Sequence, residues 1–248
     1  MEYEKEDQKY SKIGKEKKIY ILNNYPIPTD RIPRLEKIIE RRIPEVEVKK
    51  IHYKNFTREK VRDALGIILS GSSLNVSDFY HDQKLRNYFE PQLELLRKTT
   101  NTPILAICYG FHLSAFAFGI TVERMPFSHI HESVSISVDD YDELIPKKTM
   151  FVDVHHSDFV SPYDIGLKEH YEVLASCNIK GTETVQYMQH KEKPIFSVQF
   201  HPETQNHRLH YITRKKRAKL LKAKKLGEKL IENFVLLCLS YSSKAIEI

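Results

Sequence analysis

The chain has 248 residues, 41% of them apolar and 29% charged, which fits one large or two small globular domains and excludes collagen-like and low-complexity proteins. No apolar run approaches the roughly 20 residues of a membrane span, and three cysteines that cannot all pair favour a reducing, cytoplasmic compartment. The formal net charge of +6 does not indicate a nucleic-acid-binding domain, because the basic residues gather without any acidic residue between Thr204 and Gly227 and the rest is mildly acidic.

The N-terminal half alternates short apolar runs with amphipathic stretches, after a charged tail over residues 1–16. Apolar runs predict buried strands at residues 19–22, 46–51, 67–69 and 103–107. Helical spacing predicts helices at residues 34–42, 57–65, 82–98 and 110–118, with Pro91 expected to kink or divide the third. Strands that alternate with helices in this way are typical of a mostly parallel sheet covered on both faces.

The C-terminal half changes to a strict alternation of apolar and polar residues. This pattern predicts further strands at residues 134–138, 152–154, 171–175, 184–188 and 195–200. An amphipathic helix at residues 228–239 is expected to close the domain. We therefore expect one domain at residues 17–239, with a basic insert at 204–227 and a C-terminal tail at 240–248.

Cys108 lies directly after a predicted strand and directly before a predicted helix, in the string Ala106-Ile107-Cys108-Tyr109-Gly110. Small residues two positions before and two positions after it are typical of the sharp strand–turn–helix elbow that presents a nucleophile. The N-terminus of the following helix would favour the thiolate. A buried structural cysteine is the alternative interpretation, and this motif alone does not decide between the two.

A second motif, Phe200-His201-Pro202-Glu203, follows the predicted strand at residues 195–200. A histidine there can deprotonate a cysteine and later protonate a leaving amine, and a carboxylate can hold the imidazole in the required tautomer. The alternative is an ordinary histidine at a strand end beside a solvent-facing glutamate. Each motif is weak by itself, but the two together in this order are specific.

These residues resemble the class I (triad-type) glutamine amidotransferases over about residues 17–239. Gly66 to Gly71 is similar to the oxyanion-loop strand of that family, and His156-Ser157-Asp158 resembles its His-Gly-Asp stretch. The resemblance implies Cys108 as the nucleophile, His201 as the general base and acid, and Glu203 as the residue that orients His201.

The same resemblance assigns the substrate side of the site. It implies an oxyanion hole formed by the backbone N–H groups of Tyr109 and of the Gly71-Ser72 turn. It also places His112, His156 and Ser157 beside the substrate, and it implies no cofactor.

The chain departs from the family pattern on this substrate side. Ala106 replaces the usual glycine but is small enough for the elbow. Ser72 stands where a second glycine is usual, which would strain the turn if it required a positive φ. His112 replaces a glutamine that helps to hold the substrate, and brings a different reach and the capacity for a positive charge. We expect the chemistry to be retained and the substrate recognition to be altered.

The remaining histidines and cysteines do not suggest a further site. Among the histidines at positions 129, 131, 155 and 156, only His129-x-His131 has the short spacing of metal ligands, and it lacks a third ligand nearby, so we expect no metal. Cys177 and Cys238 fall on a strand end and on an apolar helix face, and we expect both to be inert.

The basic stretch from Arg208 to Lys225 has leucines and an isoleucine interspersed at roughly helical spacing. One interpretation is a solvated helix that packs a single apolar edge on the domain. The other is a docking surface for an anionic partner, either RNA, anionic lipid or an acidic protein. Because the stretch follows Glu203 closely, we expect it near the rim of the site.

We expect a flavodoxin-like three-layer α/β sandwich with a mostly parallel central sheet and added antiparallel strands. The resemblance implies hydrolysis of the γ-carboxamide of L-glutamine through a thioester on Cys108, with the ammonia delivered to a separate synthetase subunit. Two alternatives stay open. One is a stand-alone hydrolase of γ-glutamyl conjugates or peptides, which His112 favours; the other is a non-catalytic binding module on the same scaffold, which Cys108, His201 and Glu203 disfavour.

Overall fold

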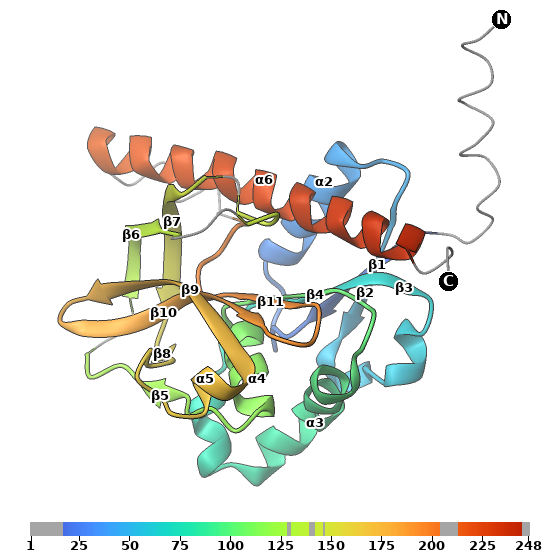
Figure 1. The fold of residues 1–248 in the computed structure, drawn as a ribbon, viewed down its shortest axis with the longest axis horizontal. Coiled ribbons are helices and arrows are strands. Elements are labelled where there is room, and N and C mark those ends of the chain that lie inside the picture. The colour runs from blue at the N-terminus through green and yellow to red at the C-terminus, as the bar shows by residue number, and fades with distance from the viewer. Residues whose placement is uncertain (1–16, 128–129, 139–141, 146, 204–212, 245–248) are drawn as a thin grey trace, which may run out of the picture.

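The computed structural model describes residues 17–127, 130–138, 142–145, 147–203 and 213–244, and its central feature is a seven-stranded sheet between two layers of helices (Figure 1). In order across the sheet, the strands are β2 (Glu47–His52), β1 (Lys18–Asn23), β3 (Ala64–Leu69), β4 (Ile104–Ile107), β11 (Ile195–Val198), β10 (Thr182–His190) and β9 (Tyr171–Ile179). Neighbours from β2 to β11 are parallel, and β10 and β9 continue the sheet as antiparallel strands. The predicted flavodoxin-like α/β fold is confirmed.

Side chains that alternate along the central strands supply one hydrophobic core on each face of the sheet. Ile19 and Ile21 of β1 share a core with apolar residues of α2 (Arg31–Arg42) and α6 (Arg214–Lys244). Tyr20 and Leu22 of the same strand face the other core, with α3 (Gln83–Lys98) and α4 (Tyr109–Ala117). Figure 1 accordingly shows α2 and α6 on one side of the sheet and α3 and α4 on the other.

Smaller elements complete the domain and carry one wall of the site. They are the antiparallel pair β6 (Ile130–Ser137) and β7 (Thr149–His156), the short pair β5 (Glu123–Arg124) and β8 (Asp158–Phe159), α5 (Leu167–His170), and the 3₁₀ turns η1 (Tyr53–Asn55), η2 (Arg58–Val61) and η3 (Val76–Tyr80). Strand β7 packs against α6 and ends at His156, next to the elbow at Cys108.

Two predicted elements differ from the structure. The helix expected from Thr57 to Leu65 is only the single 3₁₀ turn η2, because Ala64 already pairs with Lys18 as the first residue of β3, and sheet pairing overrides the helical spacing. Pro91 neither kinks nor divides the third helix, which runs unbroken from Gln83 to Lys98. The proline removes only the helical hydrogen bond to the carbonyl of Asn87, and Asn87 is an exposed residue.

The C-terminal helix α6 is longer than the predicted helix at residues 228–239, since it begins at Arg214 and ends at Lys244. The basic residues from Arg214 onward therefore belong to its first half, whereas Arg208 and the rest of 204–212 lie outside the described residues. None of the described helices is both long and apolar enough to cross a membrane.

Candidate active site

Cys108 occupies the tight turn between β4 and α4 that the sequence predicts. Its backbone has φ 52° and ψ −98°, a conformation that residues other than glycine rarely adopt and that is typical of strained functional positions. Gly110 permits this turn, because a Cβ atom there would lie 2.5 Å from the carbonyl oxygen of Leu69 on the neighbouring strand. Ala106, in place of the usual glycine, is fully buried within β4.

His201 and Glu203 follow β11, the strand next to β4, so both predicted motifs lie at the same edge of the sheet. The Nδ1 atom of His201 lies 2.7 Å from Oε1 of Glu203, and both side chains are buried. The backbone N–H of His201 donates to the carbonyl of Asp153 on β7. Gly227 of α6 touches Pro202 so closely that a side chain there would collide with the Pro202 backbone. Helix α6 thus supports the His-Pro-Glu turn.

Arg31, the first residue of α2, completes this group and was not predicted from the sequence. Its Nη1 atom donates to Oε1 of Glu203 at 3.1 Å, and its Nη2 atom lies 3.1 Å from Nδ1 of His155. The side chains of Arg31 and Glu203 are only 4% and 1% exposed. The carboxylate that faces His201 is therefore also half of a buried ion pair.

Burial and charge perturb all three predicted catalytic groups. Burial raises the pKa of the Cys108 thiol to about 12, although the positive charge of Arg31 opposes this rise. Burial, followed by the charge of Arg31, lowers the pKa of His201. Burial alone would raise the pKa of Glu203, but the charge and hydrogen bond of His201 and the charge of Arg31 lower it to about 2. The site holds a thiol, a neutral imidazole and a carboxylate at neutral pH, so the expected thiolate at the helix N-terminus is not favoured in this state.

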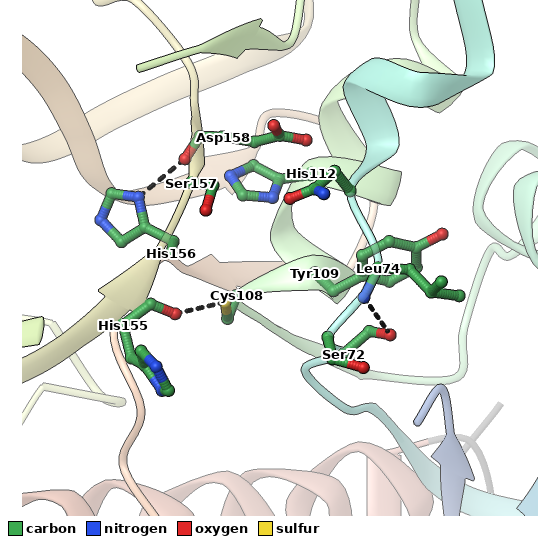
Figure 2. A pocket seen from close by; sticks show the side chains of 11 residues that line it. Ser72, Leu74, Cys108, Tyr109, His112, His155, His156, Ser157 and Asp158 are labelled. Atoms are coloured by element: carbon green, nitrogen blue, oxygen red, sulfur yellow. Dashed lines mark hydrogen bonds between the residues drawn. The ribbon is translucent and has the colours of Figure 1, made fainter. Parts of the chain in front are cut away.

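The carbonyl oxygen of His155 lies between the nucleophile and the predicted base. The Cys108 thiol donates to it at 3.6 Å, as Figure 2 shows, and Nε2 of His201 lies 3.4 Å from the same oxygen. While the ring is neutral with its proton on Nδ1, Nε2 can accept the thiol proton. Once protonated, Nε2 can donate to the His155 oxygen. The end of β7 therefore presents an acceptor to both groups.

A small cavity of about 90 Å³ opens beside Cys108 (Figure 2). The elbow and the ends of β3 and β7 line it. Its lining residues are Ser72, Ser73, Leu74, Asn75, Cys108, Tyr109, His112, His155, His156, Ser157 and Asp158. Five of the six residues predicted on the substrate side therefore meet at one cavity. Gly71, the sixth, lies just behind it, where a Cβ atom would be 2.8 Å from Cε1 of His201.

Ser72 departs from the family pattern without backbone strain. Among the described residues other than glycine, positive φ angles occur only at Cys108 and Lys180, so Ser72 has an ordinary conformation. Its hydroxyl donates to the carbonyl of Asn24 at 2.7 Å and accepts from the N–H of Leu74 at 3.0 Å. The serine side chain thus fastens the turn to the strand next to it and is occupied by the protein itself.

His112 lines the cavity and also contacts Gln199. Its Nε2 atom lies 2.7 Å from Oε1 of Gln199, and both side chains are buried. Burial lowers the pKa of His112 to about 4, so it is neutral at physiological pH and does not bring the positive charge that the sequence allowed. The adjacent His156 ring contacts the Asp158 carbonyl at 2.7 Å through Nδ1.

The other predictions on histidine and cysteine concern a metal site and the two remaining cysteines. His129 is not among the described residues, and the described part of the chain holds no group of three or more residues arranged to bind a metal ion. Cys238 is buried against Gly66, and Cys177 lies 3.8 Å from the Thr184 hydroxyl. Neither cysteine lines the cavity beside Cys108.

Comparisons with known proteins agree with this architecture. The family profile "Glutamine amidotransferase class-I" matches residues 33–217. One subunit of the glutamine-hydrolysing GMP synthase of Methanococcus aeolicus is 30% identical over 194 residues, which cover 75% of this chain and 87% of the relative. The glutamine-hydrolysing GMP synthase of Bacillus cytotoxicus is 33% identical over 181 residues, which cover 68% of this chain and 31% of that longer protein.

Solved structures show the same fold at lower sequence identity. A glutamine amidotransferase from Thermotoga maritima superposes with a TM-score of 0.70 at 11% identity, over 90% of this chain and 98% of that one.

Proposed function

The chain belongs to the class I glutamine amidotransferase family, and on this premise we propose that it hydrolyses the γ-carboxamide of glutamine through a thioester on Cys108. The observation that carries the proposal is the convergence of the strained Cys108 elbow and the His201–Glu203 pair on the carbonyl oxygen of His155, beside the cavity that Cys108 lines. A strained nucleophile and an oriented imidazole are what nucleophilic acyl transfer requires.

In the proposed reaction, the Cys108 sulfur attacks the carbonyl carbon of the γ-carboxamide while its proton passes to Nε2 of His201. Collapse of the tetrahedral intermediate breaks the C–N bond, and the same proton leaves with the nitrogen as ammonia. Water then attacks the γ-glutamyl thioester, with His201 as the base, and releases glutamate and the free thiol. Glu203 holds Nδ1 of His201 throughout.

The substrate would occupy the cavity beside Cys108. We assign the oxyanion to the backbone N–H groups of Tyr109 and of the Gly71-Ser72 turn, which flank Cys108 from α4 and from the end of β3. A donor in such a position typically contributes about 3–4 kcal/mol to transition-state stabilisation. His112, His156 and Ser157 line the other wall and would contact the rest of the substrate.

The ammonia would be passed to a separate synthetase. The M. aeolicus relative is one subunit of a GMP synthase, and the B. cytotoxicus relative is a GMP synthase of which this chain matches about a third. We propose the first half of α6 as the docking surface, with an acidic protein face as the anionic partner. Arg217, Lys222 and Lys225 are exposed there, while Leu220 and Ala223 are buried against the domain.

The proposal is tested by turnover of glutamine, γ-glutamyl dipeptides and γ-glutamyl amines by the wild type and by Cys108→Ala. We expect this variant to lose turnover and keep its fold, because the change is small and the thiol is the nucleophile. Cys177→Ala is the matched control and should remain fully active. Turnover that survives in purified Cys108→Ala would refute the assignment.

The same panel decides between free glutamine and a conjugated substrate. Turnover of γ-glutamyl peptides, with none of glutamine, would favour the stand-alone hydrolase to which His112 in place of the usual glutamine points. Inactivity on the whole panel, together with failure of Cys108 to react with a glutamine-like electrophile, would favour a non-catalytic binding module.

A further inference from the structure

Arg31 connects α2 with two segments of the site that are distant in sequence. Its guanidinium donates to Glu203, 172 residues away, and contacts the ring of His155 at the end of β7. The His155 carbonyl in turn faces both the Cys108 sulfur and Nε2 of His201. One side chain thus contacts the carboxylate that orients the base and the residue whose backbone lies beside the nucleophile.

Stability alone does not account for an ion pair in this position. Removing two charges from water costs several kcal/mol per ion, and apolar residues of similar volume often replace such pairs without loss of stability. Arg31 is 3% exposed, and its neighbour Ile32 shows that α2 has apolar side chains for the core. A buried arginine that is aimed at the site indicates a role in the site itself.

We propose that Arg31 is a positioning residue: it fixes the Glu203 carboxylate and the His155 segment around Cys108 and supplies the buried positive charge that a thiolate at Cys108 requires. The inference rests on the proposed function, since it assumes that Cys108 reacts as a thiolate. It adds a residue from the start of α2 to the predicted set of Cys108, His201 and Glu203.

Electrostatics define what the loss of Arg31 would change. The titratable and charged groups around Arg31 and Cys108 come from every neighbouring element: Tyr25 and Asp30 before α2, His155 on β7, Asp158 on β8, and His201 and Glu203 after β11. Among these groups Arg31 is the cation that lowers the pKa of both Cys108 and His201. Without it, both pKa values rise, and the activity moves to higher pH.

The test compares Arg31→Met with Arg34→Met. Arg34 lies one turn further along α2 and forms a partly buried ion pair with Glu228 of α6, away from the cavity. The readouts are the rate at which iodoacetamide alkylates Cys108 as a function of pH, followed by peptide mass spectrometry, and the pH profile of kcat/KM. A merely structural role would change the melting temperature of both variants and leave both profiles in place.

We expect Arg31→Met to shift the alkylation curve to higher pH by about one unit, which makes the reaction about tenfold slower at neutral pH. Arg31→Lys keeps the charge and should restore most of the curve, though not the two-pronged hydrogen bonding. Arg34→Met should give the wild-type curve. If the methionine variant does not fold, Arg31→Gln offers the same loss of charge with hydrogen-bond donors kept.

An Arg31→Met curve that superposes on the wild-type curve overturns the inference. So does a failure of Arg31→Lys to differ from Arg31→Met. The outcome is separable from that of the proposed function, because alkylation of Cys108 is measured without any substrate. A wild-type protein that turns over no γ-glutamyl compound would refute the proposed function, and the alkylation comparison would still decide the role of Arg31.

Discussion

Glu203→Gln is expected to lower the free energy of unfolding, because it leaves the buried guanidinium of Arg31 without a negatively charged partner. The substitution keeps Oε1, which accepts from Arg31 at 3.1 Å and contacts His201 at 2.7 Å, but it removes the negative charge. It also places an amide group where Oε2 stands, and Oε2 has no hydrogen-bond partner within the described structure. The shape of the site is therefore preserved while the charge of Arg31 loses its counterpart.

The structure sets the size of the effect. A fall in the pKa of Glu203 from its ordinary value of 4.5 to about 2 corresponds to at most about 3 kcal/mol of folding free energy, at about 1.4 kcal/mol per pKa unit, and the share that comes from the charge of His201 is absent while that ring is neutral. Removing one partner of a buried ion pair typically costs about 3–5 kcal/mol, which agrees. We therefore expect Glu203→Gln to lower the free energy of unfolding at pH 7 by about 3 kcal/mol.

The difference in stability between wild type and variant should also depend on pH, in a direction that the pKa of Glu203 determines. Because the pKa of Glu203 is lowered on folding, its contribution is complete above pH 4.5 and is lost as the pH falls towards 2, with about 2 kcal/mol gone by pH 3. His201 adds an opposite trend: Glu203 raises its pKa, so in the variant the pKa of His201 falls further, and the gap between wild type and variant widens below pH 6.5 before it closes. The gap between wild type and variant should then close below pH 4.5.

Urea unfolding at pH 7, 5, 4 and 3 measures this gap, and the double variant Arg31→Met with Glu203→Gln provides the control. Removing the cation as well should recover about 2 kcal/mol relative to the sum of the single changes, because the residues are in direct contact. A gap below about 1 kcal/mol at pH 7, a gap that does not close towards pH 3, or additive single changes would each refute the reasoning.

Two further predictions concern the substrate and the partner. His112→Gln should lower KM for free glutamine, because the amide can both keep a hydrogen bond to Gln199 and present the group usual in the family; an unchanged or higher KM in steady-state assays would favour a different substrate. Reversing Arg217, Lys222 and Lys225 to Glu should abolish capture of a synthetase partner while sparing basal hydrolysis, and capture by the wild type should weaken steeply with salt. Pull-downs at 50 and 300 mM salt check this prediction. Equal capture of the partner by the charge-reversed variant would contradict it.

Local sequence was sufficient to predict the elbow and the strands beside it. The strand before Cys108 and the helix after it were placed to within a residue, because small residues around the nucleophile and an apolar run before it permit few other conformations. The His-Pro-Glu turn was predicted for a similar reason, since it directly follows a short buried strand. Where tertiary pairing outweighs local spacing, as at Thr57, the prediction was wrong.

Contacts between distant segments could not be predicted in this way. Arg31 lies before the predicted start of its helix at Arg34, and nothing in its neighbourhood indicates a partner 172 residues away. Gln199 was only a strand residue in the sequence, yet it holds His112. Ser72 was expected to strain the turn if the turn required a positive φ, and only the structure shows that its φ is ordinary and that Asn24 and Leu74 bind its hydroxyl.

The order of charges explains how so buried a site could carry out the proposed chemistry. An isolated charge in an apolar interior is prohibitively costly, and the reaction must create two, a thiolate at Cys108 and an imidazolium at His201. The contacts run from Arg31 to Glu203 and from Glu203 to His201, with Cys108 beyond the His155 carbonyl. When the proton moves, the signs along this line alternate, so each charge has an opposite neighbour. Arg31 is the first member of that series. Without its positive charge, the Glu203 carboxylate would raise the pKa of His201, and His201 would then retain the proton that it has to give to the leaving amine.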